Sequence, residues 1–404
     1  MRGLRGDFTP RPSVNLETIV PAVPSLLSPL PVPSQRPVRV FLPCSGLGRQ
    51  RRGFETFTLE CADALRGDPR IALTVFSGAA MPGVDARARW NLRRDGALGA
   101  LVGRLVRHDS YFVEQATFFL SLLPALVLGR PDVVYFADLN VGNLCWHWRR
   151  LSRQRYKLLY YNGGLTTQPF TRTDFVQQLT PAGLDDAVAR GESRDRQVTL
   201  AHGVQVPDAL PARITGAARA ALGLPTDRPV VLSVGMLDTA IKRMDHLVRE
   251  IAAMPEPRPF LCVLGADGPD AAAVRSLAGS LLGDGVLMRS VPHEAIGDYY
   301  RAADAFVLAS LREGFGLAYV EALAHGLPIV AHDTPVTRHL LGGFAHLVDL
   351  SRTGEGTRAL DAALAAPLTE SEREAGHASA RARFGWAALR EQYTQLLLRV
   401  AEAA

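Results

Sequence analysis

The sequence predicts two doubly wound α/β domains that face a cleft, each with a parallel sheet covered by helices. Three observations support this fold class. A chain of 404 residues is too long for one compact core. Short apolar segments alternate with helical segments, which is typical of parallel sheets. This alternation begins twice, and a segment rich in glycine and proline at 203–227 separates the two halves.

The first half begins with the segment 37–43, whose β-branched residues and following glycines indicate a buried strand that ends in a loop. Phe54, Phe57, Cys61 and Leu65 then recur at the spacing of one helix face. Further strands are expected at 71–76, 132–136, 158–161 and 198–200, and helices near 96–107, 111–128 and 142–153.

The second half repeats this pattern. The strand 229–235 ends in a glycine and precedes a helix from about 244 to 254. Later strands are expected at 260–264, 286–288, 305–308, 328–331 and 345–347. The predicted divisions of the chain are therefore a tail at 1–36, an N-terminal domain at 37–203, a C-terminal domain at 204–385 and a final helix at 386–404.

The tail at 1–36 contains seven prolines and no unbroken apolar core. Because proline fixes φ and removes an amide donor, we expect a disordered tail and not a signal peptide. No apolar run reaches the roughly 20 residues that a membrane-spanning helix needs. The nearest one, at 118–128, is about half that length and is expected to be broken by Pro124.

Charge and cysteine content limit the classes of partner. The chain has 45 basic and 40 acidic residues, for a formal net charge of +5. This small excess fits a phosphate-bearing ligand or an anionic membrane surface, but it is too weak to indicate nucleic acid. Cys44, Cys61, Cys145 and Cys262 lack the spacing of a metal site, so we expect buried thiols in a reducing cytosol.

The segment 310–328 carries two glutamates, Glu313 and Glu321, with a glycine turn at 314–316 between them. A helix is expected to begin at about this turn. Glycines let the backbone approach a ligand closely, and amide groups at a helix start attract a diphosphate. Glu313 would lie beside a reacting sugar. Glu321 would lie about five residues further along the helix than the glycine turn, which is about 7.5 Å by helix rise and suits a carboxylate that binds ribose hydroxyls.

This segment is similar to the E-x7-E signature of family 4 glycosyltransferases, which are retaining enzymes of the GT-B fold. The resemblance implies that Glu313 is catalytic and contacts the donor sugar. It also implies that Gly314, Phe315 and Gly316 contact the sugar and the phosphate, and that Glu321 binds ribose. The resemblance covers about 38–400. It is specific in the C-terminal half and loose in the N-terminal half.

The same resemblance assigns roles to the two Rossmann-like domains. It makes the N-terminal domain the acceptor domain and the C-terminal domain the nucleotide-sugar domain. The final helix, which contains Trp386, would pack back on the N-terminal domain. The nucleotide base would be recognised mainly by backbone groups near Ser290 and Val291.

Lys242 and Arg243 follow the strand 229–235 and are candidates to bind the donor diphosphate. In the family, a glycine-ended strand leads to an arginine and a lysine that neutralise the charge on the leaving nucleotide. Lys242 matches the lysine with one extra loop residue, but Met236 stands where the arginine is expected. Arg243 is the candidate for the missing charge. The alternative is that both basic side chains are simply exposed at a helix start.

Gly48 lies in the glycine-rich loop 46–53 after the first strand and resembles the family's first loop, whose amides approach the donor. A lone glycine-rich loop is weak evidence, and an ordinary turn between strand and helix is the alternative. Asp138 follows the strand 132–136, where many family members have a histidine. Asp138 is a catalytic candidate that could orient an acceptor hydroxyl or accept its proton, or it could cap the next helix.

The sequence therefore predicts a cytoplasmic hexosyltransferase with a nucleotide diphosphate sugar as donor. The acceptor would be a saccharide, a lipid-linked molecule or another small molecule, and no metal, cofactor or nucleic acid is expected. One alternative is a nucleotide-sugar-binding protein or epimerase of the same fold without transferase activity. Another is an enzyme in peripheral contact with the inner face of the membrane.

Overall fold

The computed structural model describes residues 36–50, 53–164 and 170–403. The tail predicted at 1–36 therefore lies outside the described residues, except for Arg36, whose guanidinium donates to Asp132.

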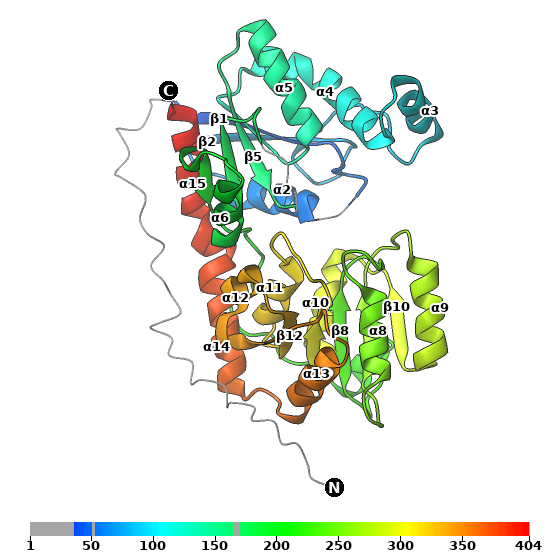
Figure 1. Cartoon of the computed structure of the whole chain (residues 1–404). Coiled ribbons are helices and arrows are strands. Elements are labelled where there is room, and N and C mark those ends of the chain that lie inside the picture. The colour runs from blue at the N-terminus through cyan, green and yellow to red at the C-terminus, as the bar shows by residue number, and fades with distance from the viewer. Residues whose placement is uncertain (1–35, 51–52, 165–169, 404) are drawn as a thin grey trace. The chain divides into compact units, whose positions relative to one another are not determined.

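The described residues form two compact units, coloured by residue number in Figure 1. The unit that we call the N-terminal unit comprises residues 36–213, 311–326 and 369–403. The unit that we call the C-terminal unit comprises residues 214–310 and 327–368.

A seven-stranded parallel sheet forms the centre of the N-terminal unit, in the order β3-β2-β1-β4-β5-β6-β7. Its strands are β1 (Val38–Cys44), β2 (Ile71–Ser77), β3 (Ala86–Ala88), β4 (Val133–Phe136), β5 (Lys157–Asn162), β6 (Phe175–Gln178) and β7 (Gln197–Thr199). Its helices are α2 (Gly53–Ala64), α3 (Ala97–Val106), α4 (Ser110–Gly129), α5 (Leu139–Ser152), α6 (Pro181–Ala189), α11 (Leu317–Ala324), α14 (Glu370–Phe384), α15 (Trp386–Glu402) and the 3-10 turn η1 (Arg194–Arg196).

Two aromatic-rich layers enclose this sheet, because successive strand residues point to opposite faces. On one face α4 and α5 pack on Phe136 and its neighbours, and Phe118 and Leu122 are fully buried there. On the other face α2 and α15 contribute Phe57 and Tyr393, which pack on each other, and Phe57 also packs on Tyr135 and Tyr161 of the sheet. Figure 1 shows these helices on opposite sides of the strands.

Helix α4 corrects the expectation that Pro124 breaks the apolar run. The helix continues through Pro124 for 20 residues. Pro124 is exposed, and so is Leu120, whose carbonyl would have accepted the missing amide bond. Water can therefore satisfy this carbonyl, and the helix persists. In length and composition α4 could span a membrane, which no other helix of the described residues could. Its inner face, however, is part of the core of the N-terminal unit.

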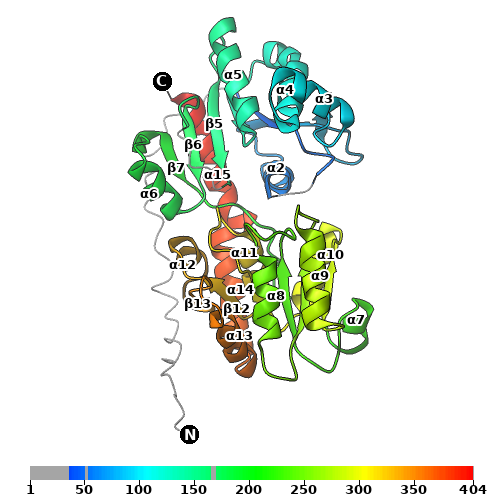
Figure 2. The same cartoon turned by 45° about the vertical axis from the view of Figure 1, so that its right-hand side comes forward.

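The C-terminal unit contains a six-stranded parallel sheet in the order β10-β9-β8-β11-β12-β13. Its strands are β8 (Val230–Val234), β9 (Phe260–Leu264), β10 (Val286–Arg289), β11 (Ala305–Val307), β12 (Ile329–His332) and β13 (Ala345–Val348). Its helices are α7 (Gly216–Ala221), α8 (Met244–Ala252), α9 (Ala271–Leu282), α10 (His293–Ala302), α12 (Pro335–Leu341), α13 (Glu355–Ala365) and the 3-10 turn η2 (Gly342–Phe344). Figure 2 shows α8 and α9 side by side, and their many contacts agree with this view.

Two parallel α/β sheets confirm the predicted fold class. Strand β6 was not predicted, because Gln177 and Gln178 give its sequence a polar pattern. Both glutamines are buried, and each hydrogen-bonds to its neighbours, Gln178 to Asn162 and Gln197. The predicted domain boundaries stay a prediction. The compact units group α11 and α14 with the N-terminal unit, where they pack on each other.

Candidate functional site

The two predicted glutamates lie on either side of the start of α11. Gly316 is the N-cap of this helix with φ of 86°, a conformation that favours glycine. A Cβ at Gly316 would lie 2.7 Å from the Tyr319 ring. Glu313 is in the loop before this turn, and Glu321 is the fifth residue of α11. Gly316 has no side chain with which to cap α11, and amide groups at a helix start can bind an anion.

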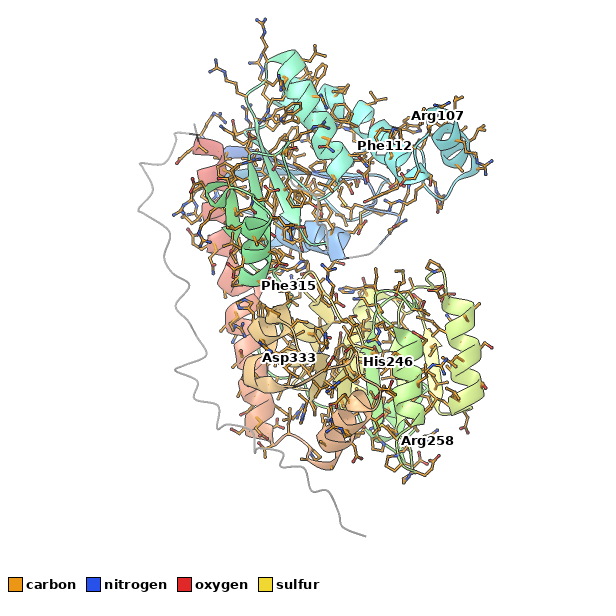
Figure 3. All side chains as sticks on the ribbon, viewed as in Figure 1. Arg107, Phe112, His246, Arg258, Phe315 and Asp333 are labelled. Atoms are coloured by element: carbon orange, nitrogen blue, oxygen red, sulfur yellow. The ribbon has the colours of Figure 1, made fainter. Side chains whose placement is uncertain are left out.

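The glycine turn packs against the end of β5. A Cβ on Gly314 would lie 2.6 Å from the carbonyl oxygen of Gly163, so only glycine allows this approach. Phe315 is 4% exposed, and its ring centroid lies 5.8 Å from that of His202 and 5.8 Å from that of Phe384. Figure 3 labels Phe315 in this packed position. The turn is therefore held by backbone contact on one side and by aromatic contacts on the other.

His202 links this aromatic contact to the core of the N-terminal unit. The hydroxyl of Tyr161 hydrogen-bonds to Nδ1 of His202, and the imidazole is 1% exposed. Burial lowers the pKa of His202 to about 3, so the ring is neutral near pH 7. Within the described residues Nε2 of His202 has no hydrogen-bond partner. Sequence reasoning did not select His202, because Phe315 is its neighbour only in the folded chain.

Glu321 lies close enough to a second carboxylate, that of Glu60 on α2, to affect its ionisation. Burial raises the pKa of Glu60 to about 7. The charge of Glu321 adds to this increase, and a hydrogen bond from Trp386 opposes it. The Trp386 Nε1 donates to Glu60 at 2.7 Å. The sequence offered no signal for the contact between Glu60 and Trp386, which forms because α2 and α15 share one face of the sheet.

In the C-terminal unit, the loop after β8 holds Lys242 at the end of that strand. The methylene carbons of Lys242 lie 3.2–3.3 Å from the position that a Cβ of Gly235 would occupy, so the side chain extends across the strand end. Asp238 is 3% exposed, and its Oδ1 accepts from the amides of Ile241 (2.6 Å) and Lys242 (2.9 Å). The loop therefore has one defined conformation. Met236, in the place of the expected arginine, is 41% exposed.

Arg243 has a structural explanation that the sequence did not provide. It precedes α8 in a left-handed conformation with φ of 50°. Its Nη1 donates to the carbonyl oxygens of Ala309 (3.2 Å) and Leu350 (2.8 Å), which follow β11 and β13. The guanidinium thus joins three strand ends of the sheet. These two hydrogen bonds occupy Nη1, and the role of Arg243 in donor binding stays a prediction.

Val291, Ser310 and Asp238 lie at the same edge of this sheet as Lys242. The carboxyl ends of parallel strands share one edge. Val291 follows β10 there, two residues before α10 begins. Ser310 follows β11 and is 2% exposed. Among the described residues, neither Ser310 Oγ nor Asp238 Oδ2 has a hydrogen-bond partner. A buried polar atom without a protein partner can bind a water or a ligand, and neither residue was selected from the sequence.

Gly48, in the N-terminal unit, is explained by packing within its own loop. It has φ of 87°, and a Cβ there would lie 2.8 Å from the carbonyl oxygen of Ala79. This fits the alternative of an ordinary turn between strand and helix. Gly46 instead faces the carboxylate of Glu55, which is 4% exposed. Whether Gly48 approaches a donor stays a prediction.

Asp138 connects the ends of β1 and β4. Its Oδ2 accepts from the amide (2.8 Å) and the hydroxyl (2.6 Å) of Ser45, and its Oδ1 accepts from Tyr111 (3.2 Å). The carboxylate is 7% exposed, and burial raises its pKa, although the Ser45 hydrogen bonds lower it. Asp138 occupies the N-cap position of α5, as the alternative predicted, but its side chain makes no capping hydrogen bond. Gln115 accepts from the amide of Asn140 instead.

Further polar side chains extend this edge, and we call the set of Ser45, Asn91, Arg94, Tyr111, Glu114 and Asp138 the polar edge. The Arg94 guanidinium pairs with the buried Glu114 and lies 4.2 Å from the Tyr111 ring centroid. Asn91 donates to the carbonyl oxygen of Ser45 at 3.0 Å. Every charged group of the set has a partner, so its geometry is fixed before any ligand arrives.

A cavity of about 210 Å³ lies at the carboxyl end of β4. Asn143 of α5 and the segment 170–173 contribute polar groups, and Phe136 and Leu139 contribute apolar walls. The end of β4 was predicted to be functional from the sequence, but the segment 170–173 was not.

Metal ligands and reactive thiols are not grouped in the described part of the chain. No three His, Cys, Asp or Glu side chains there are arranged to hold a metal ion. Cys44, Cys61, Cys145 and Cys262 are all buried and free, which confirms the expected buried thiols.

The C-terminal half of the chain matches a known protein family. Residues 215–365 match the family model described as "Glycosyl transferases group 1". A D-inositol 3-phosphate glycosyltransferase from Thermobispora bispora is 36% identical over 208 residues, which are 46% of this chain and 47% of the relative. The chain thus spans about half the length of the curated relatives it matches.

Solved structures match almost the whole chain. A sucrose-phosphate synthase from Thermosynechococcus elongatus has a TM-score of 0.72 at 21% identity and covers 91% of this chain and 100% of its own. The HepE protein from Anabaena, in complex with UDP-glucose, has a TM-score of 0.66 at 16% identity and covers 89% of this chain and 99% of its own. At these identities the likeness shows a shared fold.

Proposed function

We propose that this chain, whose residues 215–365 form a group 1 glycosyltransferase domain on a GT-B fold, moves a hexose-type sugar from a nucleotide diphosphate donor to an acceptor hydroxyl. The predicted resemblance to family 4 glycosyltransferases is confirmed by this match, which includes Glu313 and Glu321. One observation carries the proposal. The two glutamates bracket a glycine turn whose backbone packs tightly on Gly163 and which places Gly316 at the N-cap of α11.

The proposed donor contacts follow from the chemistry of each group. The amides at the start of α11 and the ammonium of Lys242 would bind the diphosphate, whose charge grows as the glycosidic bond breaks. Glu321 would accept hydrogen bonds from ribose hydroxyls, and Glu313 would contact the donor sugar. The nucleotide base would lie near Val291. This proposal assigns no metal ion and no organic cofactor to the donor, because these groups supply the neutralising charge.

The proposed transfer replaces one bond at the anomeric carbon. The bond to the diphosphate oxygen breaks, the bond to the acceptor oxygen forms, and the acceptor hydroxyl loses its proton. Retention of the anomeric configuration is part of the proposal by family resemblance. Asp138 would orient the acceptor hydroxyl, and its raised pKa makes it a better proton acceptor than an ordinary aspartate.

The acceptor, the location and the membrane contact also belong to the proposal. The cavity at the end of β4 would take part of an acceptor, since amide, hydroxyl and guanidinium groups line it. The relatives act on inositol 3-phosphate by name, but their matches cover only about half of this chain. We place the enzyme in the cytoplasm, with peripheral contact at the inner face of the membrane when the acceptor is linked to a lipid.

A thermal-shift screen with a panel of nucleotide sugars tests the proposal. A donor at 100 times its dissociation constant should stabilise the fold by about 2.7 kcal/mol. The stabilising donor is then incubated with the protein alone and with saccharide acceptors. Release of nucleoside diphosphate together with a glycosylated product supports a transferase. Binding without transfer and without slow hydrolysis would instead indicate a nucleotide-sugar-binding protein.

A further inference from the structure

Helix α3 of the N-terminal unit presents its large apolar side chains to solvent. Its buried residues are two glycines, Gly99 and Gly103. Leu98, Leu101 and Leu105 are 57%, 61% and 82% exposed. These leucines recur at the spacing of one helix face. Globular proteins normally bury such a face, so α3 has the reverse of the usual arrangement.

The two glycines fix this orientation. A Cβ on Gly99 would collide with the carbonyl oxygen of Arg93, and a Cβ on Gly103 would lie 2.7 Å from that of His108. The backbone at Arg93 and His108 therefore lies too close to α3 for any side chain larger than glycine on this side of the helix. Among the described elements, α3 makes its substantial contacts with α4 alone, and both figures show the two helices side by side. The leucine face therefore stays largely exposed in the described part of the chain.

Basic side chains border this face. Arg104 lies on α3, and Arg107 follows it in a left-handed conformation with φ of 58°. Both are exposed, and no ion pair is formed by either one within the described residues. Figure 3 labels Arg107 where α3 turns into α4. Residues 96–108 contain no acidic residue. The flanking acids are engaged, Asp95 with Arg93 and Asp109 with the amide of Phe112.

We propose that this face of α3, formed by Leu98, Leu101, Leu105, Arg104 and Arg107, docks the enzyme on an anionic lipid bilayer. An amphipathic helix in the plane of a membrane buries its apolar side chains at the level of the headgroups and places arginines beside lipid phosphates. A helix of ten residues is about 15 Å long, so it can lie on the surface but cannot cross the bilayer. Charge complementarity favours lipid over a second copy of the chain, because two such faces would bring four arginines together. The inference rests on the proposed function for its purpose, which is to bring the acceptor site to a lipid-linked acceptor.

Sedimentation of the full chain with vesicles tests this proposal. One set of vesicles is phosphatidylcholine alone, and the other is phosphatidylcholine with an equal part of phosphatidylglycerol. We expect binding to the anionic vesicles that weakens as salt is raised. Leu101→Asp combined with Leu105→Asp should weaken this binding by about tenfold or more, since two charges enter the apolar layer. Arg104→Gln combined with Arg107→Gln should reduce both the binding and its salt dependence.

A matched control is available on another helix. Leu151 at the end of α5 is 78% exposed, so Leu151→Asp changes a leucine of comparable exposure outside α3. This variant should bind vesicles like the wild type. Equal losses in Leu151→Asp and in the α3 double variant would overturn the assignment to α3. So would sedimentation of the wild type with neither vesicle, or a leucine-dependent dimer in analytical ultracentrifugation without vesicle binding.

Two further measurements keep the inference separate from the proposed function. Melting curves establish that each variant is folded, and donor stabilisation without vesicles should be unchanged in the α3 variants. If vesicle binding depends on α3 but no nucleotide sugar binds or reacts, the proposed function fails and the docking surface stands. If donor transfer occurs and no vesicle binding is found, the docking inference alone fails.

Discussion

The segment around the two glutamates and the polar edge around Asp138 differ in how their functional groups come together. Glu313, the glycine turn and Glu321 lie within nine consecutive residues, and one loop and one helix position them. Asp138 and Ser45 are 93 positions apart and meet only because β1 and β4 are neighbours in the sheet. The first arrangement is local and the second is assembled. Changes in the local segment should therefore affect ligands more than folding, and changes near the assembled edge should affect folding as well.

Glu313→Ala should have the largest effect on activity. If Glu313 contacts the donor sugar as it reacts, its loss should lower turnover by about a thousandfold, as removal of an electrostatic contact in a transition state does. A melting curve establishes that the variant is folded. Initial rates at saturating donor measure the effect. Glu374→Ala, at an exposed position on α14, is the matched control. Turnover equal to that of the wild type would count against the family assignment of this residue.

Glu60→Gln should alter the dependence of stability on pH. Burial raises the pKa of Glu60 from 4.5 to about 7, so the folded state holds this proton more tightly than the unfolded state. Tighter proton binding by Glu60 stabilises the folded wild type fully below pH 4.5, and this stabilisation is lost as the pH rises through about 7. Glutamine keeps an acceptor for Trp386 and does not ionise. Urea unfolding gives the free energy of unfolding of both proteins at pH 4 and at pH 8. Between these pH values, the variant should gain about 3 kcal/mol of stability relative to the wild type. Parallel pH profiles would show that Glu60 ionises normally.

Asp138 separates a structural effect from a catalytic one through two substitutions. Asp138→Ala leaves the buried amide and hydroxyl of Ser45 without an acceptor, which should lower the free energy of unfolding by about 2 kcal/mol. Asp138→Asn keeps one acceptor oxygen and should retain most of this stability, while turnover falls because the amide cannot take a proton. Full activity of the asparagine variant would mean that Asp138 only holds the loop after β1.

Glu321→Ala should have the smallest effect, and it should act on binding. Loss of two hydrogen bonds to ribose should weaken nucleotide diphosphate binding by about tenfold, which calorimetry can measure. Turnover at saturating donor should change less than in Glu313→Ala. A loss confined to turnover would exchange the roles proposed for the two glutamates and would remove the reason to treat α11 as the ribose side.

Residues whose roles depend on near neighbours in the chain were predictable, and those that depend on packing were not. Gly316 could be placed at a helix start because its turn and the helix follow one another directly. Arg243 looked like a phosphate ligand from its place after β8, yet its guanidinium binds the carbonyl oxygens of Ala309 and Leu350. Strand β6 escaped notice because Gln177 and Gln178 satisfy their amides only with partners from other strands.

The sequence by itself determined the two parallel sheets, the glycine turn between two glutamates and the match to a glycosyltransferase domain, since each is encoded by spacing along the chain. Tertiary structure alone decided that Phe315 packs on a neutral His202, that Asp138 accepts from Ser45, and that the leucines of α3 point outward. These facts depend on which distant segments share an interior and on where a glycine leaves no space for a Cβ. Periodicity gives a helix its apolar face, but only the packing of its neighbours decides whether that face is covered.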